Sequence, residues 1–377
     1  MIYLDSAATS LWKPPRVGDA VARAIGTMTT PGRGGHPPAM RAADAVFRCR
    51  ELAAEMFHLE DPARVVFTMN ATHGLNIAIR SLAGSGDRVL ISGFEHNAVT
   101  RPLHAIGAEI RVAGRRLFDW EDTLRSFRQQ IDGVKLVVCT HVSNVFGHIL
   151  PIAEIAALCR EKGVPLIVDA SQSAGILELD AEALQAAFVA MPGHKGLMGP
   201  QGTGLLLCGT DAAPLLFGGS GSDSRLQEMP EFYPDRLEAG TQNVCGIAGL
   251  FEGMRYVTER GTGAILRHER MLLRQAIDAL AGSGYELFTG PDWCQSGVLS
   301  LRAPGIDMEQ LASLLAEHGV CVRSGLHCAP LAHESAGTAD TGTLRMSFSP
   351  AVSRSQVLRA CSLLRQLGSG RAEMDRG

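Results

Sequence analysis

The sequence predicts an α/β protein with a large, mostly parallel β-sheet covered by helices on both faces, followed by a smaller α+β domain. From Arg64 onward, short apolar runs alternate with segments of helical spacing, as in repeated strand–helix units. After about Gly261, shorter strands and helices are interleaved instead. The length of 377 residues also exceeds what one compact core usually holds, so two domains are expected.

In the first part of the chain, residues 1–12 are expected to be extended, 29–38 to form a Gly/Pro-rich loop and 39–57 to form a helix. Strands are expected at 64–69, 88–92, 110–112, 135–140, 166–169, 187–191 and 204–208. Helices are expected at 75–82, after a turn at 70–74, and at 120–131 and 151–162. Asp119 is placed to cap the helix at 120–131, and Pro151 suits the first turn of the helix that it opens.

The second part begins with a long helix at 264–280. Further segments of regular structure are expected at 297–301, 308–318, 320–323, 343–348 and 354–367. We therefore expect a large domain at 16–260, a small domain at 261–367 that is completed by residues 1–15, and a flexible polar tail at 368–377.

The composition excludes several classes of protein. A formal net charge of −4 argues against a nucleic-acid partner. No apolar run reaches the roughly 20 residues that span a bilayer, and the first residues lack the pattern of a signal peptide. The nine cysteines are scattered, with neither a CxxC pair nor zinc-ligand spacing. We expect a cytoplasmic enzyme without a metal site or a membrane anchor.

The most informative segment is residues 191–196 (MPGHKG), which follows two apolar strands, the first of them ending in Asp169. A partly desolvated lysine amine loses its proton readily and attacks carbonyl groups. An aspartate beside such a lysine keeps the ring nitrogen of pyridoxal 5′-phosphate (PLP) protonated. We interpret Lys195 and Asp169 as this pair; the alternative is a solvated lysine in an ordinary loop.

Other polar residues follow the expected strands and meet at the same sheet edge. The turn at 70–74, with the Thr72 hydroxyl, has the form of a phosphate-binding helix start, or of an ordinary helix cap. His96, Asn144 and Gln172 are candidates for contacts with an aromatic cofactor, and equally for structural roles. The glycine-rich run at 199–204 precedes a strand rather than a helix, so we reject a nucleotide-binding loop there.

A reactive thiol is expected near the C-terminus. Cys328 lies in a Gly/His/Pro loop after a strand, near Arg323 and His327, whose positive charge would raise its thiolate fraction. The other eight cysteines are interpreted as buried, small apolar residues. Arg345 is a candidate for binding a substrate carboxylate, or an arginine on a strand surface.

Segments nearly from end to end resemble the class V aminotransferase superfamily of fold-type I PLP enzymes, and within it the cysteine desulfurase/selenocysteine lyase family. The segments are 3–9 (YLDSAAT), 33–36 (RGGH), 140–147 (THVSNVFG), 168–172 (VDASQ), 193–196 (GHKG), 238–243 (EAGTQN) and 323–329 (RSGLHCA). The resemblance implies a seven-stranded sheet, PLP as cofactor and a PLP-dependent cysteine desulfurase that converts L-cysteine to L-alanine.

The resemblance also implies residue roles. The catalytic residues would be Lys195, which forms the Schiff base, Cys328, which receives sulfur as a persulfide, and His96, which stacks on the ring. The substrate would be bound by Asn144, Arg323 and Arg345. The cofactor would be held by Ala71, Thr72, His96, Asn144, Asp169, Gln172, His194, Lys195 and Thr241. Because Thr241 would come from a second subunit, a homodimer is expected.

The chain departs from the family pattern at Pro192, His73 and Asn97, where many relatives carry serine, glutamate and histidine. A sulfur-acceptor protein, such as one of iron–sulfur cluster assembly, is a further expected partner. Two alternatives remain: a selenocysteine lyase or another class V PLP enzyme in which Cys328 is not essential, and a cofactor-binding protein without turnover.

Overall fold

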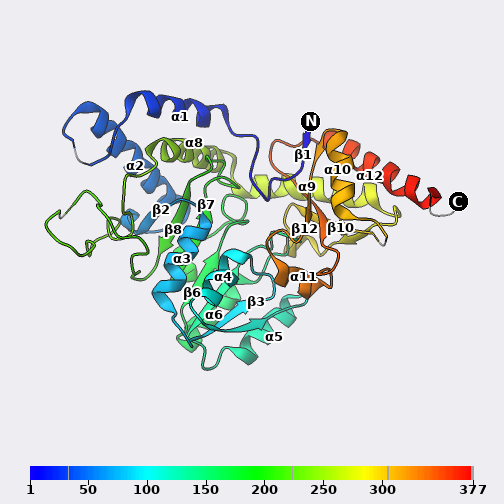
Figure 1. Ribbon diagram of the computed structural model, residues 1–377, viewed down its shortest axis with the longest axis horizontal. Coiled ribbons are helices and arrows are strands. Elements are labelled where there is room, and N and C mark those ends of the chain that lie inside the picture. The colour runs from blue at the N-terminus through cyan, green and yellow to red at the C-terminus, as the bar shows by residue number, and fades with distance from the viewer. Residues whose placement is uncertain (33, 223, 304, 375–377) are drawn as a thin grey trace.

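The computed structural model describes residues 1–32, 34–222, 224–303 and 305–374. Figure 1 shows a large body built on a central sheet and a smaller body that contains both ends of the chain. The expected fold class is confirmed. Arg33, part of the 33–36 segment, lies outside the described residues.

The large body contains a seven-stranded sheet in the order β2-β8-β7-β6-β5-β3-β4. The strands are β2 (Val65–Thr68), β3 (Arg88–Ser92), β4 (Glu109–Ala113), β5 (Leu136–Thr140), β6 (Leu166–Asp169), β7 (Phe188–Pro192) and β8 (Gly204–Cys208). The strands from β7 to β4 pair in parallel, whereas β8 is antiparallel to both of its neighbours. The carboxyl ends of the parallel strands therefore meet at one edge of the sheet.

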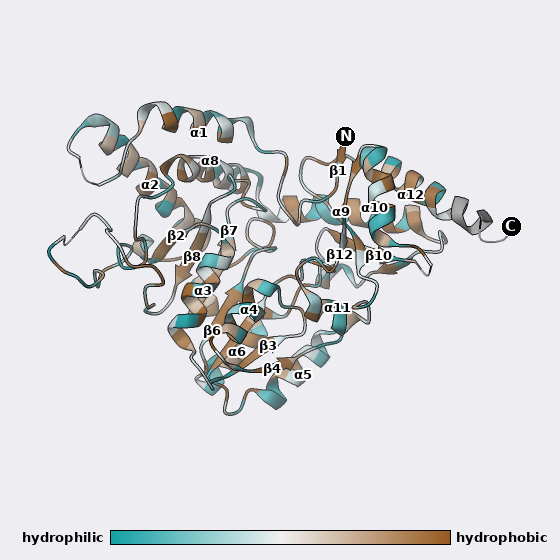
Figure 2. Cartoon of the chain, viewed as in Figure 1, coloured by the Kyte–Doolittle hydropathy of each residue, from teal (hydrophilic) through white to brown (hydrophobic). Residues whose placement is uncertain are grey.

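Both faces of this sheet are covered, which explains why its strands are continuous apolar runs. In β5, Val137 and Cys139 pack into the core on one face and Leu136 and Val138 into the core on the other. The first face is covered by α2 (Pro37–Met56), α5 (Trp120–Gln130), α6 (Ile152–Lys162) and α8 (Val244–Arg260). The second is covered by α3 (Ala71–Leu82) and α4 (Asn97–Ala105). Figure 2 shows the central strands as the most hydrophobic part of this body.

Two further helices complete the large body. The helix α1 (Pro15–Thr27) packs against α8, and α7 (Ala181–Leu184) is a single turn. Short 3₁₀ turns lie at Pro62–Arg64 and Asp292–Cys294. Within the described ranges, no helix combines the length and the apolar character needed to cross a bilayer.

The smaller body contains a four-stranded antiparallel sheet, β12-β13-β10-β9, and a parallel pair, β1-β11. Its strands are β1 (Ile2–Tyr3), β9 (Glu286–Phe288), β10 (Val298–Arg302), β11 (Val320–Cys321), β12 (Arg323–Gly325) and β13 (Thr343–Ser347). Its helices are α9 (Thr262–Leu280), α10 (Met308–Glu317), α11 (Pro330–Ala336) and α12 (Arg354–Met374).

Three expectations about local structure need correction. The expected turn at 70–74 is already helical, because the Asn70 side chain accepts the His73 N–H at 2.9 Å and caps α3. The expected strand at 320–323 is two short strands in different sheets. The expected tail at 368–377 is helical through Met374, as part of α12, and residues 375–377 lie outside the described chain.

A buried ion pair fixes α2 against the sheet and the segment before α8. Arg50 and Glu238 form two hydrogen bonds of 2.9 Å each, with side chains that are 7% and 3% exposed. Glu238 also accepts the backbone N–H of Phe67 in β2 at 2.7 Å. Removing one member of a buried, hydrogen-bonded pair leaves the other charge uncompensated.

We therefore expect Glu238→Ala to lower the free energy of unfolding by about 3–5 kcal/mol. The control is Glu259→Ala, which removes the surface pair with Arg16 and should change the free energy of unfolding far less, because solvent screens exposed ion pairs. Chemical denaturation of both variants measures the difference. Equal effects of the two substitutions would show that the buried pair is not a stabilising constraint.

Candidate active site

The expected site residues gather at the carboxyl edge of the central sheet. Asp169 ends β6 and pairs in register with Thr140 at the end of β5. His96 follows β3 and Lys195 follows β7. The small body adds the Cys328 loop, because the backbone N–H of Asn97 donates to the Cys328 carbonyl at 2.8 Å. Residues that are far apart in sequence therefore border one site. The site lies at the carboxyl ends of the parallel strands, where ligands bind in sheets of this kind.

Lys195 lies in a tight turn packed against the segment after β6. A Cβ at Gly196 would lie 2.3 Å from the Ala174 carbonyl oxygen, so only glycine fits there. Burial, opposed by the charge of Asp169 and reinforced by Arg345 and Arg323, lowers the pKa of the Lys195 amine to about 8. A large fraction of this amine is therefore neutral near pH 8 and able to attack a carbonyl carbon.

Asp169 and His96 lie next to this amine. Asp169 is 2% exposed, and its Oδ1 accepts the Ser171 N–H at 2.9 Å. His96 Nδ1 accepts the Ala98 N–H at 3.0 Å, so in the neutral ring the proton is on Nε2. Burial lowers the pKa of His96, as do the nearby positive charges, whereas Asp169 raises it. The pair thus offers a buried carboxylate and a neutral aromatic ring.

Gln172 and His194 contact the N-terminal segment of the chain. The Gln172 amide nitrogen donates to the Ala7 carbonyl at 2.9 Å, which leaves its amide oxygen for another contact. His194 Nδ1 lies 3.0 Å from the Thr9 hydroxyl, and burial, with Lys195 and Lys13, lowers the pKa of His194 to about 4. A neutral His194 binds an anion by hydrogen bonding rather than by charge.

The start of α3 points to the same edge and presents free backbone N–H groups. Ala71 is buried there and Thr72 is exposed. His73 Nδ1 accepts the Met69 N–H at 3.3 Å, and its buried Nε2 has no partner. His73 and the exposed Thr241 line one cavity of about 220 Å³. This helix start fits an anionic group, with Thr241 close to it.

Cys328 lies in a loop whose backbone is strained. His327 and Cys328 have φ angles of +50° and +57°, a region that costs a residue with a side chain about 1–2 kcal/mol. The Asn144 side chain donates to the His327 carbonyl at 2.8 Å, which holds this conformation from the large body. Cys328 is exposed, whereas the other eight cysteines are buried or half-buried.

Arg345 is buried on β13 beside this loop and is 1% exposed. Its Nη1 donates to the Asn144 carbonyl at 2.9 Å and its Nη2 to Asp5 Oδ1 at 2.6 Å. Arg323 lies directly opposite Arg345 on β12. Two arginines and one carboxylate give this corner an excess positive charge.

Sequence reasoning missed Glu95, which lies beneath the site. Glu95 is fully buried; its Oε1 accepts the Ser92 hydroxyl at 2.5 Å and the Thr140 N–H at 2.8 Å, and its Oε2 has no partner. Burial, with a smaller contribution from the charge of Asp169 and against the hydrogen bonds from Ser92 and Thr140, raises the pKa of Glu95 to about 8. The one sequence feature that could have indicated a role for Glu95 is its position directly before His96. At neutral pH the protein thus keeps a protonated acid near Asp169.

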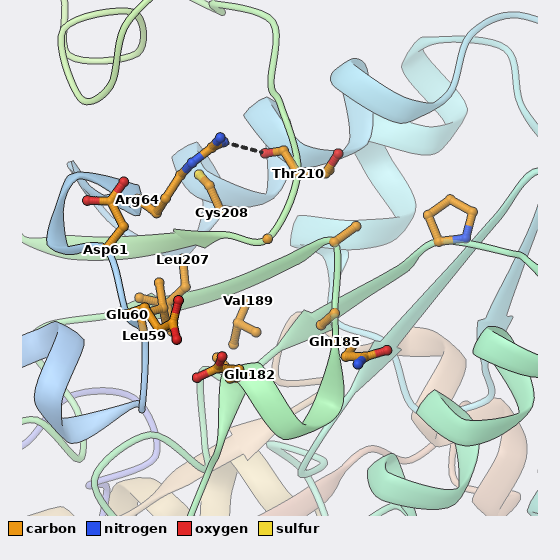
Figure 3. Close-up of a pocket in the computed structure, with 15 residues that line it drawn as sticks. Leu59, Glu60, Asp61, Arg64, Glu182, Gln185, Val189, Leu207, Cys208 and Thr210 are labelled. Atoms are coloured by element: carbon orange, nitrogen blue, oxygen red, sulfur yellow. Dashed lines mark hydrogen bonds between the residues drawn. The ribbon is translucent and has the colours of Figure 1, made fainter.

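A larger cavity, of about 440 Å³, lies away from these residues (Figure 3). It is bordered by the residues that precede β6 and β7, at the opposite edge of the sheet, and by Arg64, which hydrogen-bonds the Thr210 carbonyl. Its lining contains no lysine and no histidine. Among the described residues, no cluster of His, Cys, Asp or Glu has the arrangement of a metal site.

Comparison with known proteins identifies the family. The family model described as aminotransferase class-V matches residues 2–359. The chain belongs to the class-V aminotransferase family. This confirms the resemblance, and PLP is the cofactor of that family, which fits the buried amine, the buried carboxylate and the free helix start found here.

Individual relatives of this class-V aminotransferase are similar over almost its whole length. A probable cysteine desulfurase of Methanothermobacter thermautotrophicus is 33% identical, over 92% of this chain and 90% of the relative. A cysteine desulfurase of Haloferax volcanii is 31% identical, over 92% and 85%. The apo structure of the cysteine desulfurase from Thermococcus onnurineus superposes with a TM-score of 0.90 at 30% identity, covering 98% of this chain and 95% of that one.

The raised pKa of Glu95 predicts a pH-dependent stability. Between about pH 4.5 and pH 8 the unfolded chain ionises this carboxyl while the folded chain keeps it protonated, so this residue destabilises the fold increasingly as pH rises. Glu95→Gln removes the effect. The melting temperature of the variant relative to the unchanged protein should therefore rise from pH 5 to pH 8, whereas the exposed Glu121→Gln should show a constant difference. If the melting temperatures of Glu95→Gln and the unchanged protein differed by the same amount at every pH, the raised pKa of Glu95 would be contradicted.

Proposed function

We propose that this class-V aminotransferase is a PLP-dependent cysteine desulfurase that converts L-cysteine to L-alanine and takes the sulfur onto Cys328 as a persulfide. The observation that carries the proposal is the joint placement of a buried, readily deprotonated Lys195 and an exposed Cys328 at one sheet edge. The cysteine desulfurases to which the chain is similar support it.

The residues present suit the cofactor. Lys195 supplies the amine for its aldehyde, Asp169 a carboxylate for its ring nitrogen, and His96 a neutral ring to stack on it. The other proposed contacts are those of Ala71, Thr72, Asn144, Gln172, His194 and Thr241. When bound, PLP supplies an electron sink for the substrate's Cα and Cβ carbons.

In the proposed reaction, Arg345 and Arg323 bind the substrate carboxylate, and Lys195 moves the proton at Cα. The thiolate of Cys328 attacks the substrate sulfur, so a sulfur–sulfur bond forms while the Cβ–S bond breaks and its electron pair stays with carbon. That carbon takes up a proton, which gives alanine. The persulfide is then passed to an acceptor thiol, such as that of a sulfur-carrier protein of iron–sulfur cluster assembly.

Asn144 has a more specific proposed role than the sequence indicated. Its side chain donates to the Cys328 loop and its carbonyl accepts from Arg345, so it joins the proposed sulfur-accepting and carboxylate-binding groups. Since the loop is strained, this contact keeps the thiol in place.

We also propose that the protein is a homodimer in which Thr241 reaches the partner's phosphate site. The segment that leads to Thr241 projects from the large body (green, left in Figure 1) and exposes Leu216 and Phe217 at 49% and 76%. Within one chain, Leu216 and Thr241 border a cavity beside the first turn of α3, so a second copy that covered this segment would lie next to the helix start. Exposed apolar side chains beside a binding site fit a second copy of the chain.

The remaining proposals concern organisation and location. We propose a large domain at 16–260 and a small domain at 261–367 completed by residues 1–15, because β1 pairs with β11 of the small body. All nine cysteines are free, which supports a reducing, cytoplasmic location.

Replacing Cys328 tests the sulfur-accepting role. We expect Cys328→Ala to reduce sulfide and alanine formation from L-cysteine by at least about a hundredfold, because it removes the exposed thiol that would accept the sulfur. Cofactor absorbance should be unchanged. The matched control is Cys321→Ala, which removes a half-buried thiol on β11 and should retain activity. Full activity of Cys328→Ala would favour a class V enzyme with a different reaction.

Replacing Phe217 tests the dimer. Phe217→Asp replaces this exposed ring with a carboxylate. The mass measured by light-scattering chromatography should then fall from that of two chains to that of one, because desolvating an unpaired carboxylate opposes association. Leu358→Asp, at an apolar residue on α12 that is 47% exposed, should leave the mass unchanged. A dimer that tolerates Phe217→Asp would place the interface elsewhere.

A further inference from the structure

The buried guanidinium of Arg345 is held by two acceptors from distant parts of the chain. Asp5 accepts from Nη2 and the Asn144 carbonyl from Nη1, while the buried Nε has no hydrogen-bond partner among the described residues. A buried cation needs a counter-charge, and Arg345 forms an ion pair with Asp5. Arg323, on the adjacent strand, adds a second positive charge to the corner. With Asp5 in place, a net positive charge and a free donor remain for an anion.

Asp5 is fixed to the same strand as Arg345. The Ser347 N–H donates to the Leu4 carbonyl at 2.8 Å, and the Ala7 N–H donates to the Ser347 hydroxyl at 2.9 Å. A β-bridge joins Asp5 to Ser347, two residues beyond Arg345 on β13. The Asp5 carboxylate is therefore carried by backbone that is paired on both sides, so its position relative to the guanidinium is set by the fold.

The same segment continues to the amine of the site. Ala7 accepts the Gln172 amide N–H at 2.9 Å, and the Ser10 hydroxyl donates to the Lys195 carbonyl at 3.1 Å. Figure 1 shows this segment running between the small body and α1 of the large body. The N-terminal segment 5–10 thus sets the spacing between Arg345, which would bind the carboxylate of an α-amino acid, and Lys195, which would hold the cofactor that receives the amine.

We propose that Asp5 is a positioning residue for amino-acid recognition, which holds the Arg345 guanidinium so that its free N–H groups receive the substrate's α-carboxylate. This inference rests on the proposed function. Asp5 neutralises one of the two arginine charges and orients the guanidinium plane, and the incoming carboxylate satisfies the Nε–H that now lacks a partner. Asp5 does not contact the reacting sulfur or carbon atoms.

The alternative role of Asp5 gives the opposite result. If its carboxylate occupied the place of the substrate carboxylate, it would have to leave before substrate bound. Removing its charge would then strengthen binding. The near-isosteric Asp5→Asn separates the two cases, because it keeps the volume and one acceptor but removes the charge that strengthens the hydrogen bond.

The test uses the PLP-loaded full chain. For Asp5→Asn we expect KM for L-cysteine to rise roughly tenfold, the loss expected for one charge-assisted hydrogen bond, with kcat within about twofold. Independently of turnover, cofactor absorbance gives the dissociation constants of L-alanine and of ethylamine, which lacks the carboxylate. The L-alanine constant should rise by a similar factor and the ethylamine constant should not. A purely structural role would shift both.

The control is Glu286→Gln, which removes an ion pair with Arg302 at 2.6 Å in the same small sheet; it should change neither constant. Unchanged or tighter L-alanine binding in Asp5→Asn would overturn the inference, as would equal weakening for both ligands. The proposed function fails separately, if the unchanged protein releases no sulfide from L-cysteine.

Discussion

The burial of one amine is the constraint on which the site depends. Lys195 is held in a turn that requires glycine at Gly196, and desolvation lowers the pKa of its amine to about 8. The protonated form of this amine is stabilised by the negative charge of Asp169, which is also buried and ends the strand that neighbours β7. A large sheet covered on both faces is what places an amine and a carboxylate together out of water.

The small body supplies what the large sheet lacks. Cys328 and Arg345 are tied to the sheet edge by contacts that cross between the bodies, among them the bond from the Asn97 N–H to the Cys328 carbonyl and the two hydrogen bonds of Asn144. The N-terminal segment crosses in the other direction, from β13 to Lys195. Substrate binding and sulfur transfer would therefore both depend on how the two bodies are held. The strain at His327 and Cys328 is sustained by the same contacts.

The sequence predicted most of the sheet because its buried strands are continuous apolar runs separated by helical spacing. It missed α8, whose glycines weaken the helical signal: a Cβ at Gly253 would lie 2.5 Å from the Leu197 carbonyl, so close packing dictates glycine there. It missed α4, which contains Pro102, and α1. The sequence predicted one strand at 320–323 in place of β11 and β12, because strands of two or three residues are too short to show the alternation of buried and exposed side chains.

For the site, chemistry-bearing residues at strand ends were recognisable, but partners that act through contacts distant in sequence were not. Asp5 and Arg345 are 340 positions apart, and Glu95 acquires its raised pKa only from burial in the folded chain.

The central claim is that Lys195 is the lysine joined to PLP. The lysines of the chain are Lys13, Lys135, Lys162 and Lys195. Lys13 is the informative competitor, because burial also lowers its pKa to about 8 and it donates to the His194 carbonyl at 3.0 Å. Borohydride reduction of the PLP-loaded protein, followed by mass spectrometry of its peptides, locates the bond. The account predicts a pyridoxyl group on the peptide that contains Lys195; a label on Lys13, or on no lysine, would contradict it.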